Sequence, residues 1–282
     1  MTTLHPLLAR ITAEAACLGG DEVGVWLADS RQVMATLAAP ELALNPAERA
    51  RAAGFRLPAD RAMFVAAHLL ARYAAAGALG WSPTHIDLAG DARGRPRLLS
   101  PWGPLGLDLS LSHSGGRVAI ALMREGRCGV DLEHHRDSLP VACLSPLACS
   151  PHEQAGLARL APSARGLAFL ALWTGKEALL KGIGVGVVAD LTHLSLEPVW
   201  PAPARLVADA GFPGLERGWT LWHGRPRHGL SLALAARRPR GPIRARFSHL
   251  GGPEAFADMH SKGIPVVMRT ESDTSLAQMP LS

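Results

Sequence analysis

The sequence predicts an α+β fold built from two similar halves. Two observations indicate this class: helical segments are followed by strand-like segments twice along the chain, and a connector rich in His, Pro and Ser separates the two rounds. A third is that FVAAHLLAR (64–72) and FLALWTGKEALLK (169–181) share an apolar frame beginning at Phe. Halves placed face to face would leave a cleft between them.

The predicted boundaries follow from this order. The tail holds Gly, Pro, Ser and Arg without a clear apolar face, so we expect it to be disordered or loosely attached. The segments are an N-terminal extension over 1–20, an N-terminal α+β half over 21–133, a connector over 134–149, a C-terminal α+β half over 150–236 and the tail over 237–282.

The first half begins with EVGVWLADS (22–30), which has the apolar content and length of a strand. A helix is predicted over 45–55, with Asn45 as its cap and Pro46 at its first position. A long Ala- and Leu-rich helix is predicted over 58–80, and GDARGRPRL (90–98) indicates a loop. Three strands follow, over 107–112, 117–123 and 128–133.

The second half begins with SPHEQAGLARL (150–160). Ser150 and Glu153 form a capping-box pattern at its start, so a helix is predicted there. A longer helix follows at about 163–182. Four strand-like runs come after it, over 191–198, 204–209, 219–224 and 228–236.

Composition narrows the class of protein. The 282 residues carry a formal net charge of +5, which suits an anionic ligand, an acidic partner or nucleic acid. The four cysteines show no C-x-x-C pairing, so we expect reduced thiols in a cytoplasmic protein. The first 17 residues make a poor signal peptide, and arginines interrupt the apolar windows, so no membrane span is expected.

The stretch GVDLE (129–133) places two carboxylates on one face of a strand. Side chains alternate along a strand, so Asp131 and Glu133 share a face while Val130 and Leu132 enter the core. The carboxylates repel each other unless a cation lies between them. An isolated D-x-E is more often simply a strand that ends in solvent.

The stretch WTGKEALLK (173–181) places Trp173, Glu177 and Lys181 on one helical stripe, four residues apart. Taken alone, Glu177 and Lys181 are more often a surface pair worth about 0.3–0.5 kcal/mol. The apolar flanks favour a covered helix, where charges are costly unless they face a polar cleft. If Glu177 meets Asp131 and Glu133 there, the three carboxylates suit Mg²⁺, and Lys181 would reach a phosphate of the same substrate.

The stretch LSHSGG (111–116) reads as a strand that runs into a turn. The hydrolase elbow G-x-S-x-G would need glycine at position 112, where serine stands, which argues against Ser114 as a nucleophile. Ser112, His113 and the turn amides can form an anion site instead. An ordinary turn with a structural histidine is the alternative.

Together and in this order, four motifs closely resemble the 4'-phosphopantetheinyl transferases, of the monomeric type that activates peptide synthetases. The pattern W-[ST]-x-K-E-x-x-x-K stands complete over 173–181, and the resemblance covers about residues 22–236. The motifs are GRP (94–96), LSLSHSGG (109–116), GVDLE (129–133) and FLALWTGKEALLKGIGVGV (169–187).

This resemblance implies a pseudo-twofold α+β fold that transfers phosphopantetheine from coenzyme A to a serine of an acyl or peptidyl carrier protein, releasing adenosine 3',5'-bisphosphate. It places the Mg²⁺ ligands at Asp131, Glu133 and Glu177, and the phosphate-binding lysine at Lys181. The carrier is expected to be acidic and to serve fatty acid or secondary metabolite biosynthesis, and the enzyme is expected to be a monomer. Neither a membrane nor nucleic acid is an expected partner.

The resemblance also assigns coenzyme A contacts to Ser112 and His113, and to Arg95, which stands where the family often has lysine. The family's D-R-x-R-F helix entry reads Asp60-Arg61-Ala62-Met63-Phe64, with methionine where a phosphate-contacting arginine is common. Arg61 is therefore predicted to bind coenzyme A. Arg49, Arg51 or Arg61 could supply the contact with the 3'-phosphate.

The chemistry agrees with these residues. A divalent ion and Lys181 can neutralise the negative charge that builds on the phosphoryl oxygens. The attacking serine must lose a proton to Glu133 or Glu177, directly or through water, and we favour Glu177. A metal-dependent phosphodiesterase or nuclease could use the same carboxylates. A non-enzymatic nucleic-acid-binding module is the other rival, although no aromatic platform lies among the arginines.

Overall fold

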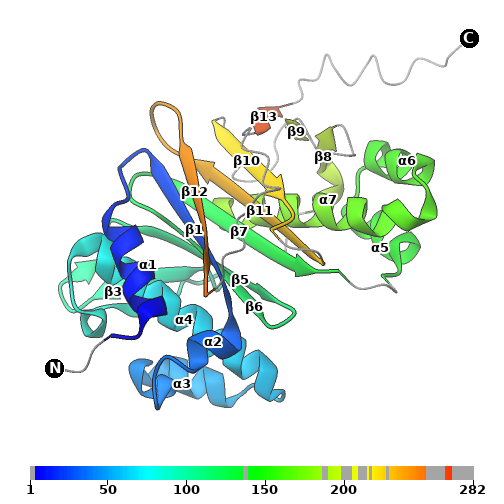
Figure 1. The fold of residues 1–282 in the computed structure, drawn as a ribbon. Helices are drawn as coiled ribbons and strands as arrows, with labels where there is room; N and C mark the ends of the chain where they lie inside the picture. Colours follow the sequence, from blue (N-terminus) through cyan, green and yellow to red (C-terminus); the bar gives the residue numbers. More distant parts are fainter. Residues whose placement is uncertain are drawn as a thin grey trace, which may run out of the picture.

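The computed structural model describes residues 4–135, 139–185, 190–197, 205–208, 215, 218–226, 229–251 and 264–268. Among them the strands form a four-stranded, a six-stranded and a three-stranded sheet, with helices packed against the two larger sheets (Figure 1). The mixture confirms the predicted α+β class. The pseudo-twofold relation between the halves stays a prediction.

The elements of the first half run from α1 to β7. The helices are α1 (Pro6–Ala16), α2 (Ser30–Met34), the 3-10 turn η1 (Pro40–Ala43), α3 (Pro46–Ala53), α4 (Pro58–Leu79) and the 3-10 turn η2 (Pro83–His85). The strands are β1 (Glu22–Asp29), β2 (Asp87–Gly90), β3 (Pro96–Ser100), β4 (Gly103–Pro104), β5 (Asp108–Ser114), β6 (Arg117–Met123) and β7 (Arg127–His134).

The elements of the second half begin after the connector. The helices are α5 (Val141–Ala148), α6 (Pro151–Arg159), α7 (Pro162–Ile183) and the 3-10 turn η4 (Leu191–His193). The strands are β8 (Leu194–Glu197), β9 (Arg205–Ala208), β10 (Trp219–Gly224), β11 (Leu230–Arg237), β12 (Arg244–Leu250) and β13 (Ile264–Met268). The predicted capping box of Ser150 and Glu153 is present at α6, and the predicted cap Asn45 is present at α3, where it also forms a capping box with Glu48.

The first core lies between the sheet β12-β1-β6-β5 and helices α1 and α4. Helix α4 is long and apolar enough to cross a membrane, but 78% of its apolar window is buried inside the fold, as in a core helix. Helix α1 belongs to the same core, because Leu8 and Ile11 are fully buried. Residues 6–16 are therefore an integral part of the first half, although the sequence indicated only an extension there.

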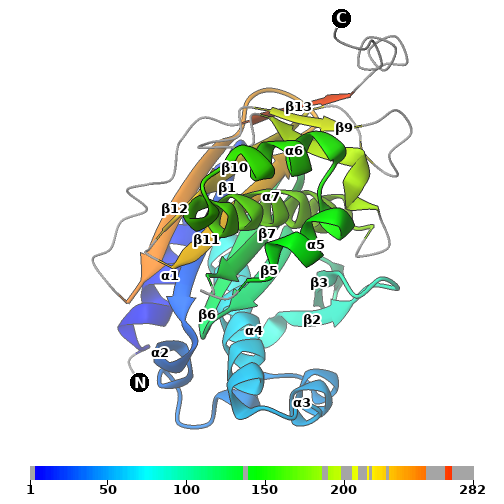
Figure 2. The ribbon, with the colours of Figure 1, turned by 90° about the vertical axis from the view of Figure 1, so that its right-hand side faces the viewer.

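The second core lies between the sheet β7-β11-β10-β13-β9-β8 and helix α7, with α5 and α6 alongside (Figure 2). Strand β7 pairs antiparallel with β11 over its whole length. It therefore belongs to the second sheet, although the predicted boundary at 133 assigned it to the first half. The connector also differs from its prediction, because residues 141–148 form α5.

Side-chain hydrogen bonds join the two larger sheets where β5 lies beside β7. Alternate side chains of β5 accept hydrogen bonds from alternate backbone amides of β7, at distances of 2.7–3.2 Å. The offset is 20 residues at every step, so the two strands run parallel. The pairs are Asp108 with Cys128, Ser110 with Val130, Ser112 with Leu132, and Ser114 with His134. We call this row the serine seam.

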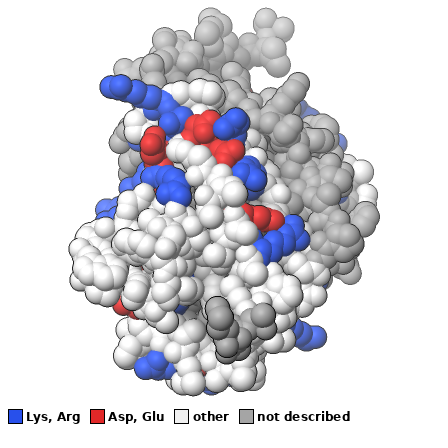
Figure 3. Space-filling view, turned by 60° about the vertical axis from the view of Figure 1, so that its left-hand side comes forward, with Lys and Arg blue, Asp and Glu red and all other residues white. Residues whose placement is uncertain are grey.

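The predicted disordered tail is wrong for residues 244–250. They form β12, which pairs in parallel with β1, and Leu250 is fully buried. Arg244 pairs with Asp21 and Glu22 at the start of this strand pair. Acidic and basic side chains lie next to one another on the face shown in Figure 3. The remainder of the predicted tail, apart from 238–243, 251 and β13, lies outside the described residues.

The predicted loop over 90–98 is also partly wrong. Strands β2 and β3 pair antiparallel around it, with Gly90 opposite Pro96. Asp91 closes the turn, because its carboxylate accepts from the backbone amides of Arg93 and Arg95. The Gly and Arg residues of this stretch therefore make a tight hairpin turn. Gly90, Gly94 and Pro96 of this hairpin line the cavity described in the next subsection.

Candidate functional site

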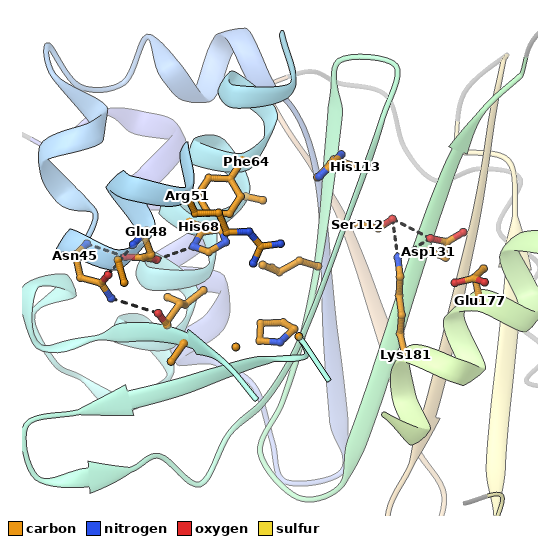
Figure 4. Close-up of a pocket in the computed structure, with 18 of the residues that line it drawn as sticks. Asn45, Glu48, Arg51, Phe64, His68, Ser112, His113, Asp131, Glu177 and Lys181 are labelled. Atoms are coloured by element: carbon orange, nitrogen blue, oxygen red, sulfur yellow. Dashed lines mark hydrogen bonds and ion pairs between the residues drawn. The ribbon is translucent and has the colours of Figure 1, made fainter. Parts of the chain in front are cut away.

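A cavity of about 590 Å³ lies between α3 and α4 on one side and β5, β7 and α7 on the other. Figure 4 shows the two groups of side chains that face each other across it. The near wall carries Asp131, Glu133, Glu177 and Lys181, all predicted from the sequence. The far wall carries the predicted candidate Arg51 together with residues that the sequence motifs did not include, among them Glu48 and His68.

The close approach of α7 to β7 brings the acidic residues together. A Cβ atom at Gly129 would lie 2.0 Å from the carbonyl oxygen of Ala178 and 2.3 Å from the amide of Gly182, so only glycine fits. Because side chains alternate along β7, Asp131 and Glu133 share the face of Gly129 and meet α7 there. The helix then presents Glu177 and Lys181, four residues apart, to the same cavity.

Asp131 lies at the centre of this wall and is only 4% exposed. Its Oδ1 accepts from the Lys181 ammonium at 2.6 Å and from the Ser112 hydroxyl at 2.9 Å. The ammonium also donates to the Ser112 hydroxyl at 3.0 Å. The serine seam therefore fixes Asp131 and Lys181 relative to β5.

Glu133 and Glu177 lie in an environment that disfavours their charged forms. Burial raises the pKa of both carboxyls, and the charge of Asp131 raises it further. Hydrogen bonds from Ser114 and Trp173 and the charge of Lys181 act in the opposite direction at Glu133, but the net shift is upward. One lysine therefore does not neutralise the three carboxylates.

The carboxylates of the near wall can supply oxygen ligands to a divalent cation. Among the described residues, no three Asp, Glu, His or Cys side chains already stand in a metal-binding arrangement. Yet Asp131 Oδ2 and Glu177 Oε1 are buried without a hydrogen-bond partner. Buried carboxylate oxygens are rarely left unpaired, and such hard oxygen donors suit Mg²⁺. The donor set therefore fits the predicted ion.

Lys176, from the same motif, has a different environment. Its side chain is fully buried, and its ammonium donates to Glu153 Oε2 at 2.5 Å and to the carbonyl oxygens of Ala148 and Leu191. All three ammonium protons are satisfied away from the cavity. Lys176 is thus a structural residue that ties α5, α6 and η4 to α7.

The predicted coenzyme A contacts divide into two groups. Ser112 and His113 line the cavity. The Arg95 side chain instead donates to Asp108 at 2.5 Å and to the carbonyl oxygens of Cys128 and Gly182. This buried position lies behind the wall, and the neighbouring Gly94 and Pro96 line the cavity. The structure therefore does not place the Arg95 guanidinium where the sequence indicated.

Three arginines were candidates for the 3'-phosphate contact. Within the described part of the chain, Arg51 lines the cavity, whereas Arg49 and Arg61 are absent from its lining. Arg61 lies 3.6 Å from Glu41 at the surface, and Arg49 donates to the carbonyl oxygen of Leu44. Arg51 stacks over the Phe64 ring, 5.3 Å from its centroid. Figure 4 shows its guanidinium extending from the far wall toward the cavity.

The far wall also holds a buried network that the motifs missed. Glu48 accepts from the guanidinium of Arg72 and contacts His68 Nδ1 at 2.6 Å. Burial raises the pKa of Glu48, but the hydrogen bonds from His68 and Arg72 outweigh it and lower the pKa to about 2. A signal was present in the sequence, because Asn45 and Glu48 have capping-box spacing and His68 and Arg72 lie one turn apart.

Comparisons with known proteins agree with this arrangement. Residues 127–228, which include β7 and α7, match the family described as the 4'-phosphopantetheinyl transferase superfamily. The chain is 31% identical to the 4'-phosphopantetheinyl transferase HetI of Nostoc sp. over 64% of its own length and 77% of that protein. It is 30% identical to a phosphopantetheinyl transferase of Thraustochytrium sp. over 57% of its own length and 59% of that protein. A putative 4'-phosphopantetheinyl transferase of Synechocystis sp. is 30% identical over 54% of this chain and 61% of its own length.

Proposed function

This chain belongs to the 4'-phosphopantetheinyl transferase superfamily, and we propose that it transfers the phosphopantetheine of coenzyme A to a serine of a carrier protein in a Mg²⁺-dependent reaction. The observation that carries the proposal is a single cavity with carboxylates and a lysine on one wall and cationic groups on the other. Coenzyme A carries phosphates at both its pyrophosphate and its 3' position, so it matches a cavity in which one wall would hold Mg²⁺ beside a lysine and the other carries Arg51.

The near wall would receive the pyrophosphate. Asp131, Glu133 and Glu177 would hold Mg²⁺, which supplies Lewis-acid stabilisation of charge on phosphoryl oxygens when bound. Lys181 would turn from Asp131 to a phosphate oxygen, because it lines the cavity and its side chain is 31% exposed. Ser112 would keep Asp131 in place during this exchange, since its hydroxyl donates to the same carboxylate.

The transfer step forms a bond between the carrier serine oxygen and the pantetheine-linked phosphorus and breaks the bond from that phosphorus to the leaving oxygen. The serine proton passes to Glu177, and adenosine 3',5'-bisphosphate leaves. Burial and the charge of Asp131 raise the pKa of Glu177, which makes it a stronger base than an exposed glutamate. Glu133 shares this property, and so is the alternative acceptor of the proton.

Arg51, from the far wall, and His113, from β5 on the opposite side of the cavity, would contact the 3'-phosphate. Both line the cavity, and the charges of Lys181 and Arg51 reach His113, where they lower its pKa together with the larger effect of partial burial. Arg51 would make the phosphate contact that is commonly made by an arginine at the position of Met63. The same position suits an anion because Phe64 holds the guanidinium from one side.

The type of carrier protein, the cellular location and the oligomeric state are also proposals. The net charge of +5 supports an acidic carrier domain from fatty acid or secondary metabolite biosynthesis. The four cysteines are free thiols, which supports a cytoplasmic location. We propose that the enzyme acts as a monomer, because the cavity walls all come from one chain.

The direct test is a mass measurement on the acceptor. Incubation with coenzyme A, Mg²⁺ and an apo carrier protein should add about 340 Da to the carrier, the mass of the phosphopantetheine group. A carrier in which the acceptor serine is replaced by alanine is the matched control. Absence of a mass gain across fatty acid, polyketide and peptide carriers would refute the proposal. Hydrolysis of coenzyme A without a carrier would favour a phosphodiesterase instead.

A further inference from the structure

We propose that His68 is a specificity-determining residue that reads the 3'-phosphate of coenzyme A, with Glu48 as the residue that positions it. The proposal rests on the proposed function and deepens it at the far wall of the same cavity. The family motifs include neither residue.

The imidazole of His68 lies beside two other side chains that line the cavity. His68 lies on α4, one turn after Phe64, and the two rings are in contact with their centroids 4.0 Å apart and their planes tilted by 35°. Arg51 covers the same Phe64 ring from α3. The three side chains therefore form one continuous surface of the cavity, with Arg51 and His68 at its edges (Figure 4).

Glu48 sets the orientation of the ring. Glu48 contacts Nδ1 at 2.6 Å, and the pKa of Glu48 of about 2 keeps it ionised at neutral pH. A carboxylate accepts only, so Nδ1 carries a proton and donates it to Glu48. The other ring nitrogen, Nε2, is the group left to contact a ligand. Glu48 is itself held by Arg72 and by the Asn45 backbone amide, so the orientation is rigid.

The nitrogen donors that line the cavity indicate the chemistry of the ligand. Arg51 from α3, His113 from β5 and His68 from α4 line one cavity, and the carboxylate in this region, Glu48, is already paired with Arg72. A dianionic phosphomonoester suits such a group of nitrogen donors. In coenzyme A the 3'-phosphate is the phosphomonoester, whereas 3'-dephospho-coenzyme A lacks it and is otherwise the same molecule. The pair of coenzymes therefore isolates this contact.

Two substitutions separate a ligand contact from a structural role. Asparagine places its amide near the position of Nδ1, so His68→Asn keeps the contact with Glu48 and loses the group that faces the cavity. Glutamine places its amide near Nε2, so His68→Gln does the reverse. Both variants would be compared with His152→Gln, an exposed histidine on α6, after circular dichroism has shown that they are folded.

The measured quantity is the preference for coenzyme A over 3'-dephospho-coenzyme A in kcat/KM with an apo carrier. His68→Asn should reduce this preference about tenfold to hundredfold through the KM for coenzyme A, as expected for a lost charged hydrogen bond. Values for 3'-dephospho-coenzyme A should stay the same, and His68→Gln should retain most of the preference. A wild-type preference in His68→Asn would overturn the inference.

Binding measured by calorimetry distinguishes failure of the proposed function from failure of the His68 inference. If wild-type protein modifies no carrier but binds coenzyme A more tightly than 3'-dephospho-coenzyme A, the proposed function fails and the His68 contact can still be tested by affinity. If it modifies carriers equally well from both coenzymes, the function stands and the inference fails. Should the variants not fold, ¹⁵N-histidine spectra of the wild type give the test: an imidazole resonance set that responds equally to both coenzymes would overturn it.

Discussion

Replacing Lys176 with methionine should strongly lower the free energy of unfolding, although it changes no residue that lines the cavity. Lys176 and Glu153 are both fully buried, and the ammonium satisfies the carbonyl oxygens of Ala148 and Leu191 in addition to the carboxylate. Methionine fills the space but leaves Glu153 charged and unpaired. Breaking a buried pair by removing one partner costs about 3–5 kcal/mol.

The structure allows a sharper form of this test. Glu153 also accepts from the backbone amides of Ser150 and Leu196, one at each carboxylate oxygen, and the single carbonyl oxygen of glutamine can keep one of these two contacts. The double variant Lys176→Met/Glu153→Gln removes the unpaired charge, so it should recover part of the stability that the single variant loses. The two substitutions should therefore be strongly non-additive.

Urea unfolding followed by far-ultraviolet circular dichroism measures the free energy of unfolding of both variants. In thermal unfolding, the melting temperature of Lys176→Met should fall by roughly 10 °C. Lys181→Met is a suitable comparison, because the Lys181 side chain is 31% exposed and pairs with Asp131 at the cavity. It should cost much less stability. A loss below about 1 kcal/mol in Lys176→Met, or a double variant no better than the single one, would refute the assignment of Lys176 as a buried structural charge.

Three further predictions concern other parts of the chain. Asp131→Asn should lower carrier modification at least about hundredfold with an unchanged circular dichroism spectrum, because it removes a proposed ion ligand; near-normal activity would contradict that role. The low pKa of Glu48 stabilises the fold above pH 4.5 and this contribution of about 3 kcal/mol is lost as pH falls toward 2, so the stability advantage of wild type over Glu48→Gln should shrink in urea titrations at pH 6, 4 and 3. A constant difference would argue against the network. Leu250→Ala should cost about 3 kcal/mol in the same urea assay, because Leu250 is fully buried, whereas an unattached tail would show no loss.

The acidic wall could be predicted from the sequence because its signals are local. Alternation along a strand places Asp131 and Glu133 on one face, and helical spacing places Glu177 and Lys181 on one stripe. Their meeting depends on Gly129, whose missing side chain allows α7 to approach. The prediction that these distant residues meet came from the family resemblance. The positions of the acidic residues in the cavity agree with the prediction, and their roles remain to be tested.

The errors came from pairings between distant parts of the chain. Residues 244–248 alternate polar and apolar side chains, which is a strand signal, but β1, the partner of this strand, lies over 200 residues earlier. A local pattern does not indicate such a partner. Arg95 was misplaced for a similar reason: its charge suggested a phosphate, and only the fold reveals that Asp108 and two carbonyl groups already satisfy it.

The serine seam makes the junction of the two sheets unusually dependent on side-chain identity. In an ordinary sheet, backbone groups bond to backbone groups, so most substitutions leave the pairing intact. Between β5 and β7, a single change at Ser110, Ser112 or Ser114 would delete a rung outright. Substitutions at these three hydroxyls would therefore alter how tightly β5 packs against β7 and, under the proposed function, the width of the opening through which a carrier domain would deliver its serine.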